Sequence, residues 1–119
     1  MDYSLQVRVS FDAGHEWTSP DPGSKCRRQG HGHRYQIRAN INGRMDEMIS
    51  SRTSDLRLEM QQIQLELEGT VLEAMLPGIE TTPDRIAAWV LERLGGKAES
   101  VTVSCDQDSS VTVTKTARR

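Results

Sequence analysis

The sequence predicts a single α+β domain in which four antiparallel strands form one sheet and two helices cover one face of it. Three observations predict this class: two segments of alternating polar and apolar residues near the N-terminus, two helix-spaced segments in the middle, and two short alternating segments near the C-terminus. The order strand, strand, helix, helix, strand, strand is compatible with antiparallel pairing throughout. A chain of 119 residues has the size of one domain, so we assign residues 1–119 to it.

The first two predicted strands flank a long loop. Apolar residues alternate with polar ones from Leu5 to Phe11, and the alternation resumes at His33 and runs to the turn signal Asn42-Gly43. Residues 12–30 between them are rich in glycine, proline and charged residues, which is typical of a loop. The two strands are therefore expected to pair as a hairpin around a long loop, and such loops are often functional.

A first helix is expected from Asp55 to about Met75. Apolar residues recur there at helical spacing, and Ser54 precedes them as an expected N-cap. Gly69 and Thr70 interrupt good helix formers, so the last turns are the weakest part of this prediction.

A second helix is expected over residues 83–94. Thr82-Pro83-Asp84 supplies a hydroxyl cap, a proline at the first helical position and an acid near the positive helix end, and a Gly-Gly pair follows residue 94. Two final strands, residues 101–105 and 111–115, are joined by turn-forming residues.

Composition limits the function classes. Hydrophobic content of 35% and aromatic content of 4% are low for a small self-sufficient domain, so association between copies is expected. Fifteen basic and seventeen acidic residues give a net charge of -2 without a clustered basic field, which argues against nucleic acid as a partner. The local basic run Lys25, Arg27 and Arg28 is interpreted as solvated surface, with an anionic small molecule as the alternative.

The chain shows no sign of a membrane segment or a leader. Its N-terminus starts at once with an alternating pattern, and no apolar run approaches the roughly 20 residues that span a bilayer. We therefore expect no membrane partner and a cytoplasmic location. In a reducing compartment the two cysteines, Cys26 and Cys105, are expected to be thiols rather than a disulfide.

The three histidines of the chain predict a metal site. His31 and His33 are two apart at the entrance of the second strand, so their imidazoles are expected on one face, and His15 follows the first strand. If the two strands pair, the three imidazoles converge. Zinc suits three nitrogen ligands, and the fourth position left for water or substrate is the catalytic arrangement. The alternative is a pair of partly exposed loop histidines.

Three strings of residues stand out as motifs: Phe11-Asp12-Ala13-Gly14-His15, then Lys25-Cys26 with His31-Gly32-His33-Arg34-Tyr35, and Pro77-Gly78-Ile79-Glu80-Thr81-Thr82-Pro83-Asp84-Arg85-Ile86-Ala87. Together they resemble the motifs of the 6-pyruvoyl-tetrahydropterin synthase and 6-carboxytetrahydropterin synthase family, and the resemblance spans nearly the whole chain. It implies a T-fold, in which four-stranded sheets join as a trimer into a barrel, commonly stacked as a hexamer, with active sites between subunits. It also implies zinc bound by His15, His31 and His33, and dihydroneopterin triphosphate as the family's substrate.

The sequence departs from the family pattern at its catalytic residues. The family's general base is a cysteine that works with an Asp-His couple in a Leu-Asp-His-x-x-Leu-Asn segment. Here four residues separate Cys26 from His31, where the family has three, and the matching segment runs from Leu67-Glu68-Gly69 to Glu73. Gly69 thus replaces the catalytic histidine. Glu68 and Glu73 are our candidates for proton transfer; the alternative is that both are solvent-facing glutamates.

A second departure concerns the substrate ring. The family anchors the pterin with a glutamate on the third strand, and the matching position here is Cys105, with Asp106 one step away. Losing a carboxylate there removes a charge-assisted hydrogen bond, and an unpaired buried donor costs about 1–3 kcal/mol. Pterin recognition is therefore expected to be weakened.

Three hypotheses follow. The first is a zinc enzyme repurposed for carbon–carbon bond chemistry at an aldehyde or ketone, for example a Pictet–Spengler-type condensation in secondary metabolism. The second is the standard family lyase, with Cys26 as base and Glu68 covering the missing couple. The third is a non-catalytic protein in which zinc staples the hairpin, with Cys26 closing the site as a fourth ligand.

Overall fold

The computed structural model describes residues 1–15, 31–45 and 49–116. Four strands form one antiparallel sheet in the order β1-β2-β3-β4, so that β1 and β4 are its edges. Their bounds are β1 (Asp2–His15), β2 (His31–Arg44), β3 (Ser100–Ser104) and β4 (Val111–Thr114). The predicted class and strand pairing are confirmed.

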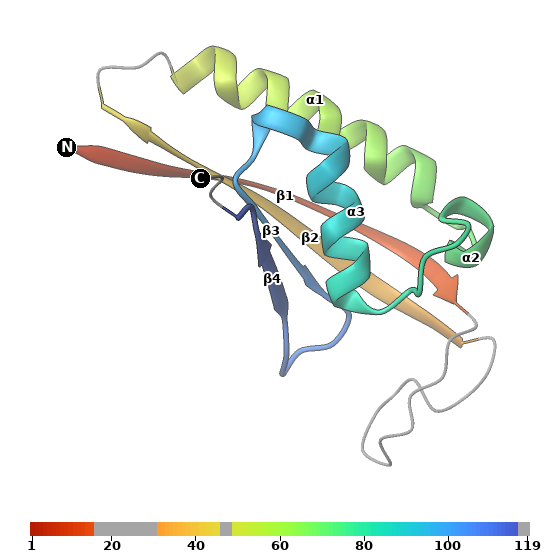
Figure 1. The fold of residues 1–119 in the computed structure, drawn as a ribbon. Helices are drawn as coiled ribbons and strands as arrows, with labels where there is room; N and C mark the ends of the chain where they lie inside the picture. Colours follow the sequence, from red (N-terminus) through yellow and green to blue (C-terminus); the bar gives the residue numbers. More distant parts are fainter. Residues whose placement is uncertain (16–30, 46–48, 117–119) are drawn as a thin grey trace.

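Helices cover one face of the sheet (Figure 1). They are α1 (Ile49–Leu67), α2 (Leu72–Met75) and α3 (Pro83–Leu94), followed by the 3-10 turn η2 (Gly95–Lys97). Helix α1 packs mainly on β1, whereas α3 packs on β3 and β4. No helix in the described ranges is long and apolar enough to cross a membrane.

The first two strands are longer than predicted. β1 continues to His15 and β2 begins at His31, with Gly14 opposite Gly32 in the ladder. Glycine carries no side chain, so it hides the alternating pattern, but its backbone still pairs across the ladder. Residues 12–15 therefore belong to a strand, and the prediction that the loop starts at residue 12 is wrong.

The first predicted helix is wrong at both ends. Helix α1 begins at Ile49, so Ser54 lies inside it, and polar residues fill its first turns and give no apolar signal. It ends at Leu67, whose carbonyl accepts hydrogen bonds from the N–H (3.2 Å) and hydroxyl (2.7 Å) of Thr70. Gly69 adopts a φ of 72°, which favours glycine, and the chain turns there instead of continuing as a helix.

The core lies between the sheet and the helices. The odd-numbered strand positions point into it, and they are buried: Val7, Val9, Phe11, Ala13, Tyr35, Ile37, Ala39, Ile41, Val101 and Val103. Helices α1 and α3 close it with Leu56, Met60, Ile63, Leu67, Ile86, Ala87, Val90, Leu91 and Leu94. His15 and His33 continue this odd-numbered series, so the metal site predicted from the sequence would lie at the end of the core.

One ion pair joins the two long helices. Arg93 Nη1 and Nη2 donate to the two carboxylate oxygens of Glu66 at 2.6 and 3.1 Å. The hydrogen bonds from Arg93 hold the pKa of Glu66 below its usual value, and the same contact raises the pKa of Arg93. At the start of α3, the hydroxyl of Thr82 similarly lowers the pKa of Asp84.

Candidate metal and substrate site

The ends of β1 and β2 bring the histidine positions together. His15 is the ladder partner of His31, and His33 is the partner of Ala13. The imidazole rings of His15 and His33 have centroids 4.9 Å apart, and His15 is only 2% exposed. The predicted convergence therefore holds for these two rings, while the side chain of His31 lies outside the described residues.

Aromatic residues support the two imidazoles from below. The ring of Tyr35 meets His15 edge-on at 6.3 Å and His33 at 5.8 Å, and it stacks on Phe11 at 5.4 Å. Phe11 and Tyr35 are fully buried core residues. The histidine rings thus lie against a rigid apolar support, which limits the orientations that they can adopt.

His15 also contacts a polar pair from the helical layer. Thr81 Oγ1 lies 3.3 Å from His15 Nδ1 and donates a 2.7 Å hydrogen bond to Glu73 Oε2. Thr81 is almost completely buried. Sequence reasoning gave Thr81 no role, although it lies in the family-like string before α3; only the fold shows that this hydroxyl reaches His15.

The segment after α1 docks along the edge of β1. Gly69 N–H donates to Asp12 O at 2.7 Å, and Gly14 N–H donates to Thr70 O at 2.9 Å. Val71 continues this contact as an isolated parallel bridge to Gly14. These bonds fix residues 69–71 beside the histidine end of the sheet.

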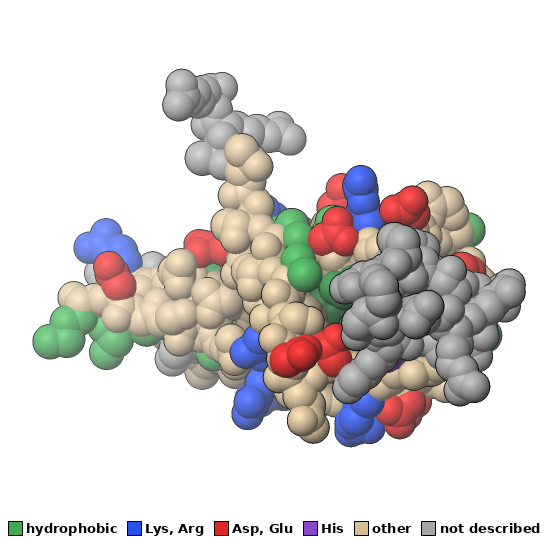
Figure 2. All heavy atoms as spheres, turned by 90° about the horizontal axis from the view of Figure 1, so that it is seen from below, with side chains coloured by type: hydrophobic (Ala, Val, Ile, Leu, Met, Phe, Trp, Pro, Cys, Tyr) green, Lys and Arg blue, Asp and Glu red, His purple; other side chains and the backbone are tan. Residues whose placement is uncertain are grey.

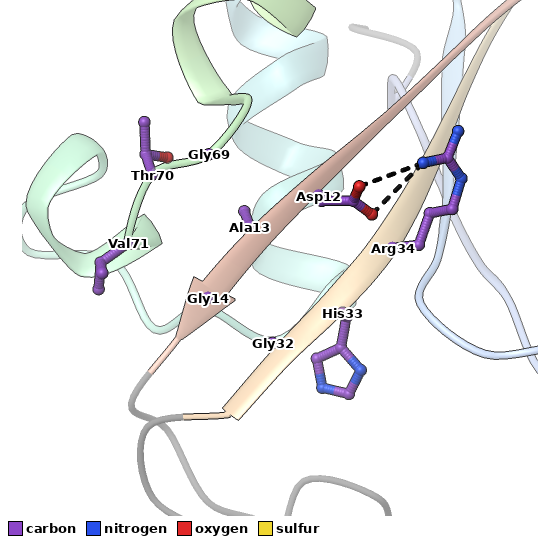
Figure 3. A pocket seen from close by; sticks show the side chains of 9 residues that line it. All are labelled: Asp12, Ala13, Gly14, Gly32, His33, Arg34, Gly69, Thr70 and Val71. Carbon is purple, nitrogen blue, oxygen red and sulfur yellow. Dashed lines mark hydrogen bonds and ion pairs between the residues drawn. The ribbon is translucent and has the colours of Figure 1, made fainter.

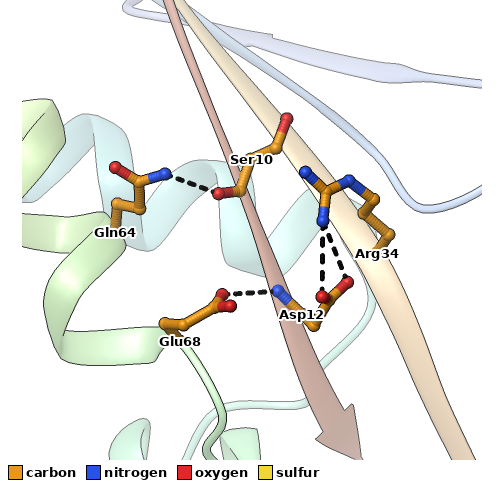
Figure 4. Close-up of polar contacts among 5 residues, drawn as sticks. All are labelled: Ser10, Asp12, Arg34, Gln64 and Glu68. Carbon is orange, nitrogen blue, oxygen red and sulfur yellow. Dashed lines mark hydrogen bonds and ion pairs between the residues drawn. The ribbon is translucent and has the colours of Figure 1, made fainter.

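A side chain from the last turns of α1 and one from the residue that follows the helix complete the same edge (Figure 4). Gln64 Nε2 donates to Ser10 O at 2.7 Å, and Asp12 N–H donates to Glu68 Oε2 at 2.7 Å. The carboxylate of Asp12 in turn pairs with Arg34 Nη1 at 3.3 Å. Glu68 is an exposed residue, but one carboxylate oxygen is held by the backbone of β1 and is therefore fixed in place.

A cavity of about 590 Å³ opens at this end of the sheet (Figure 3). Its lining residues come from the ends of β1 and β2 and from the docked segment: Asp12, Ala13, Gly14, Gly32, His33, Arg34, Gly69, Thr70 and Val71. Three of these are glycines, so bare backbone forms much of the wall. A small molecule can therefore approach His33 closely.

Gly69, which the sequence matches to the family's catalytic histidine, lines this cavity. A Cβ built on Gly69 would have no atom within 4 Å. Gly69 itself presents no side chain to this cavity.

The two predicted substrate-binding residues lie just beyond β3. Cys105 is half-buried and packs against the core. Asp106 Oδ1 accepts hydrogen bonds from the N–H (3.2 Å) and hydroxyl (2.7 Å) of Ser109, so it shapes the turn between β3 and β4. Both residues line a second cavity of about 400 Å³ with Ser10, Arg34 and Gln36. Their role in substrate binding stays a prediction.

Two predicted site residues cannot be placed in this way. Cys26 falls outside the described residues, as does the side chain of His31. Among the described side chains, no group of three or more metal-ligating residues comes together. The zinc site therefore stays a prediction supported by the pair His15 and His33.

Charged side chains of both signs lie on the surface of the described residues. Viewed from below Figure 1, acidic and basic side chains are interspersed on this face (Figure 2).

A family model described as 6-pyruvoyl tetrahydropterin synthase matches residues 4–118. A comparison with curated proteins gives no match.

Solved structures share the fold. The 6-pyruvoyl tetrahydropterin synthase of Caenorhabditis elegans superposes with a TM-score of 0.79 at 18% identity, covering 98% of this chain and 97% of that one. An uncharacterised protein from Wolinella succinogenes gives a TM-score of 0.73 at 17% identity, covering 98% and 99%. The 6-pyruvoyl tetrahydropterin synthase of Plasmodium falciparum gives 0.68 at 15% identity, covering 96% and 98%. At these identities the likeness establishes the T-fold of the subunit and nothing finer.

Proposed function

Because this chain belongs to the 6-pyruvoyl tetrahydropterin synthase family, we propose that it is a zinc-dependent enzyme whose reaction has diverged from the family's triphosphate elimination. The observation that carries this proposal is the composition of one site. His33 lines the cavity and its ring lies 4.9 Å from that of the buried His15, while Gly69 lines the same cavity at the position that matches the family's catalytic histidine.

The residues present fit a zinc ion. His15 and His33 offer two imidazoles with centroids 4.9 Å apart, and His31 is the ladder partner of His15. Three imidazoles suit tetrahedral zinc and leave a position for a ligand oxygen. When bound there, zinc would supply Lewis-acid polarisation of a substrate carbonyl group.

The chain's own residues would bind the substrate and move a proton. The glycine-lined wall of the cavity admits a small molecule beside His33, and the hydroxyl of Thr81 steadies His15. Glu68 is our candidate for proton transfer, because it directly precedes Gly69 and its carboxylate is fixed by the N–H of Asp12. Cys105 and Asp106 remain our candidates for contacts with the rest of the substrate.

Carbon–carbon bond formation beside a carbonyl fits this set of residues. In a Pictet–Spengler-type condensation, an amine and an aldehyde lose water to form an iminium ion. A ring carbon then attacks the iminium carbon, and the ring proton leaves to a base. Such a reaction requires one carboxylate base and no histidine relay, which matches a site that has Glu68 and lacks an imidazole at position 69.

The test compares two substrates with one preparation. Zinc-loaded protein is incubated with dihydroneopterin triphosphate and, separately, with an arylethylamine and a set of small aldehydes; released triphosphate and cyclised product are quantified. We expect product formation that stops after zinc is chelated and returns when zinc is added back, with no triphosphate release above the chelated control. Zinc-independent turnover, or no product from any aldehyde, contradicts the proposal.

The second candidate is the standard family lyase. It is favoured by the position of Glu68 and residues 69–71, which lie beside the histidines where the family's couple belongs. Zinc-dependent triphosphate release in the same experiment would establish it. The third candidate, a zinc-stapled binding protein, requires Cys26 as fourth ligand. Loss of zinc retention in Cys26→Ala would support it.

We propose that the chain assembles by pairing β1 of one subunit with β4 of the next, as in the trimeric barrel that the family resemblance implies. At the C-terminal end of β1, the edge groups of Ser10, Asp12 and Gly14 are already bonded to residues of the α1 region. By the alternation of an antiparallel ladder, the N–H groups of residues 4, 6 and 8 face the same edge. Pairing between subunits is therefore confined to the first half of β1.

Replacing Gln6 with proline should block this assembly. The N–H that proline removes points away from β2, so the internal ladder keeps its bonds, and proline is tolerated at an edge of this kind. We expect a shift from trimer or hexamer to monomer in size-exclusion chromatography with light scattering. Gln6→Ala, which keeps the N–H, is the matched control. A Gln6→Pro variant that stays folded and oligomeric would exclude this edge as the interface.

A further inference from the structure

The hydroxyl of Thr81 lies between an imidazole and a carboxylate. Thr81 Oγ1 is 2.7 Å from Glu73 Oε2 and 3.3 Å from His15 Nδ1. Thr81 is 1% exposed and His15 is 2% exposed, so both groups are shielded from solvent that could otherwise exchange for these contacts. The three residues come from different places in the fold: the end of β1, helix α2, and the segment before α3.

Counting protons assigns the direction of each hydrogen bond. A hydroxyl has one proton to donate and can accept with its lone pairs. The carboxylate of Glu73 can only accept, so the short contact uses the Thr81 proton. The contact with His15 must then run the other way, with Nδ1–H donating to Thr81 Oγ1. A neutral His15 consequently carries its proton on Nδ1, and its Nε2 is unprotonated.

We propose that Glu73 is a positioning residue that acts through Thr81 to fix the tautomer and ring orientation of His15. This inference rests on the proposed zinc site, because an imidazole binds a metal through an unprotonated ring nitrogen, here Nε2. Metal-ligating histidines commonly donate their second ring N–H to a carboxylate or carbonyl group. Here a buried hydroxyl stands between the imidazole and the carboxylate, and Glu73 thereby has a role other than proton transfer to substrate.

The surrounding backbone makes this relay rigid. Residues 69–71, which lead into α2, are bonded to the edge of β1 through Gly69 and Gly14. Leu72, the first residue of α2, is fully buried. The distance between Glu73 and the end of β1 is therefore set by the fold rather than by side-chain rotamers alone.

The first measurement reads the tautomer without any metal. Long-range 15N–1H spectra of the metal-free full chain, recorded at a pH at which the imidazole is neutral, should show His15 as the Nδ1–H form in the wild type. Thr81→Val removes the hydroxyl with little change of shape, and Glu73→Ala removes its acceptor; both should give a mixture of tautomers. Thr81→Ser keeps the hydroxyl and should retain the wild-type form. Glu80→Ala removes an exposed charge next to Thr81 and serves as the matched control.

The second measurement is zinc affinity by competition with a chelator. Thr81→Val and Glu73→Ala should weaken zinc binding about 10–100-fold, the range typical of residues that orient a metal ligand. Thr81→Ser and Glu80→Ala should bind as the wild type does. The proposal that Glu73 acts through Thr81 on His15 is wrong if His15 of the wild type is in the Nε2–H form. It is also wrong if Thr81→Val changes neither the tautomer nor the zinc affinity. If the wild type binds no zinc, the proposed function fails instead, and the metal-free spectra still decide the relay.

Discussion

Replacing His33 with alanine should lower zinc affinity by more than about 100-fold, because the loss of a direct ligand exceeds the 10–100-fold cost of losing an orienting residue. His33 contributes one of two imidazoles whose rings lie 4.9 Å apart, and it is one of the residues that line the cavity. In the variant, His15 and His31 alone would supply too few ligands for a stable tetrahedral zinc site.

Metal analysis after dialysis checks this expectation. The wild type should retain about one zinc ion per chain, in line with one three-histidine site, and His33→Ala close to none. Gln36→Ala is the matched control: it removes a side chain from the same strand, but from the opposite face of the sheet, as the buried odd-numbered positions indicate. An unchanged zinc-to-protein ratio in His33→Ala would remove the metal site, and with it the proposed carbonyl chemistry.

Zinc binding should also raise the thermal stability of the folded protein. A ligand that binds only the folded state stabilises it by about 2.7 kcal/mol at a free concentration of 100 times Kd. Zinc should therefore raise the unfolding midpoint of the wild type and of Gln36→Ala, but not that of His33→Ala. The thermal shift separates loss of the site from loss of the fold, because His33→Ala without zinc should unfold close to the metal-free wild type.

The sequence predicted the fold well wherever side chains report on the backbone. The alternation from Leu5 to Phe11 located the first strand, although that strand extends beyond the alternation at both ends. The Thr82-Pro83-Asp84 start gave helix α3 with the same bounds as the structure. The prediction failed at Gly14 and Gly32, which carry no side chain, and at the polar first turns of α1. Periodicity has no signal in such places, although hydrogen bonds continue through them.

The candidate site shows the same limit. The spacing of His31 and His33 and the order of the strands predicted that His15 and His33 would converge. Thr81 is separated along the sequence by 66 positions from His15 and by 8 from Glu73. No local sequence pattern could therefore reveal that the three residues meet. For Glu68 the sequence gave the position, but only the fold shows that an N–H of β1 holds its carboxylate.

Replacing Phe11 with alanine should destabilise the domain by about 3–5 kcal/mol, the usual range for removing a buried aromatic ring. Phe11 is 0% exposed and stacks on Tyr35 with ring centroids 5.4 Å apart and an interplanar angle of 19°. Equilibrium unfolding in urea, at one fixed protein concentration, measures the free energy. Leu58→Ala is the matched control, because Leu58 is 66% exposed on α1 and its truncation should stay within about 0.5 kcal/mol.

The position of Phe11 gives this variant a second consequence. Tyr35 lies between Phe11 and the two histidines, meeting both imidazole rings edge-on. A cavity in place of Phe11 would let Tyr35 move away from those rings, so zinc affinity should fall although no ligand is changed. Phe11→Leu, which keeps most of the volume, should lose less stability and less affinity. If Phe11→Ala lost stability but bound zinc as the wild type does, the histidines would not depend on this aromatic support, and their convergence would be a property of the strand ladder alone.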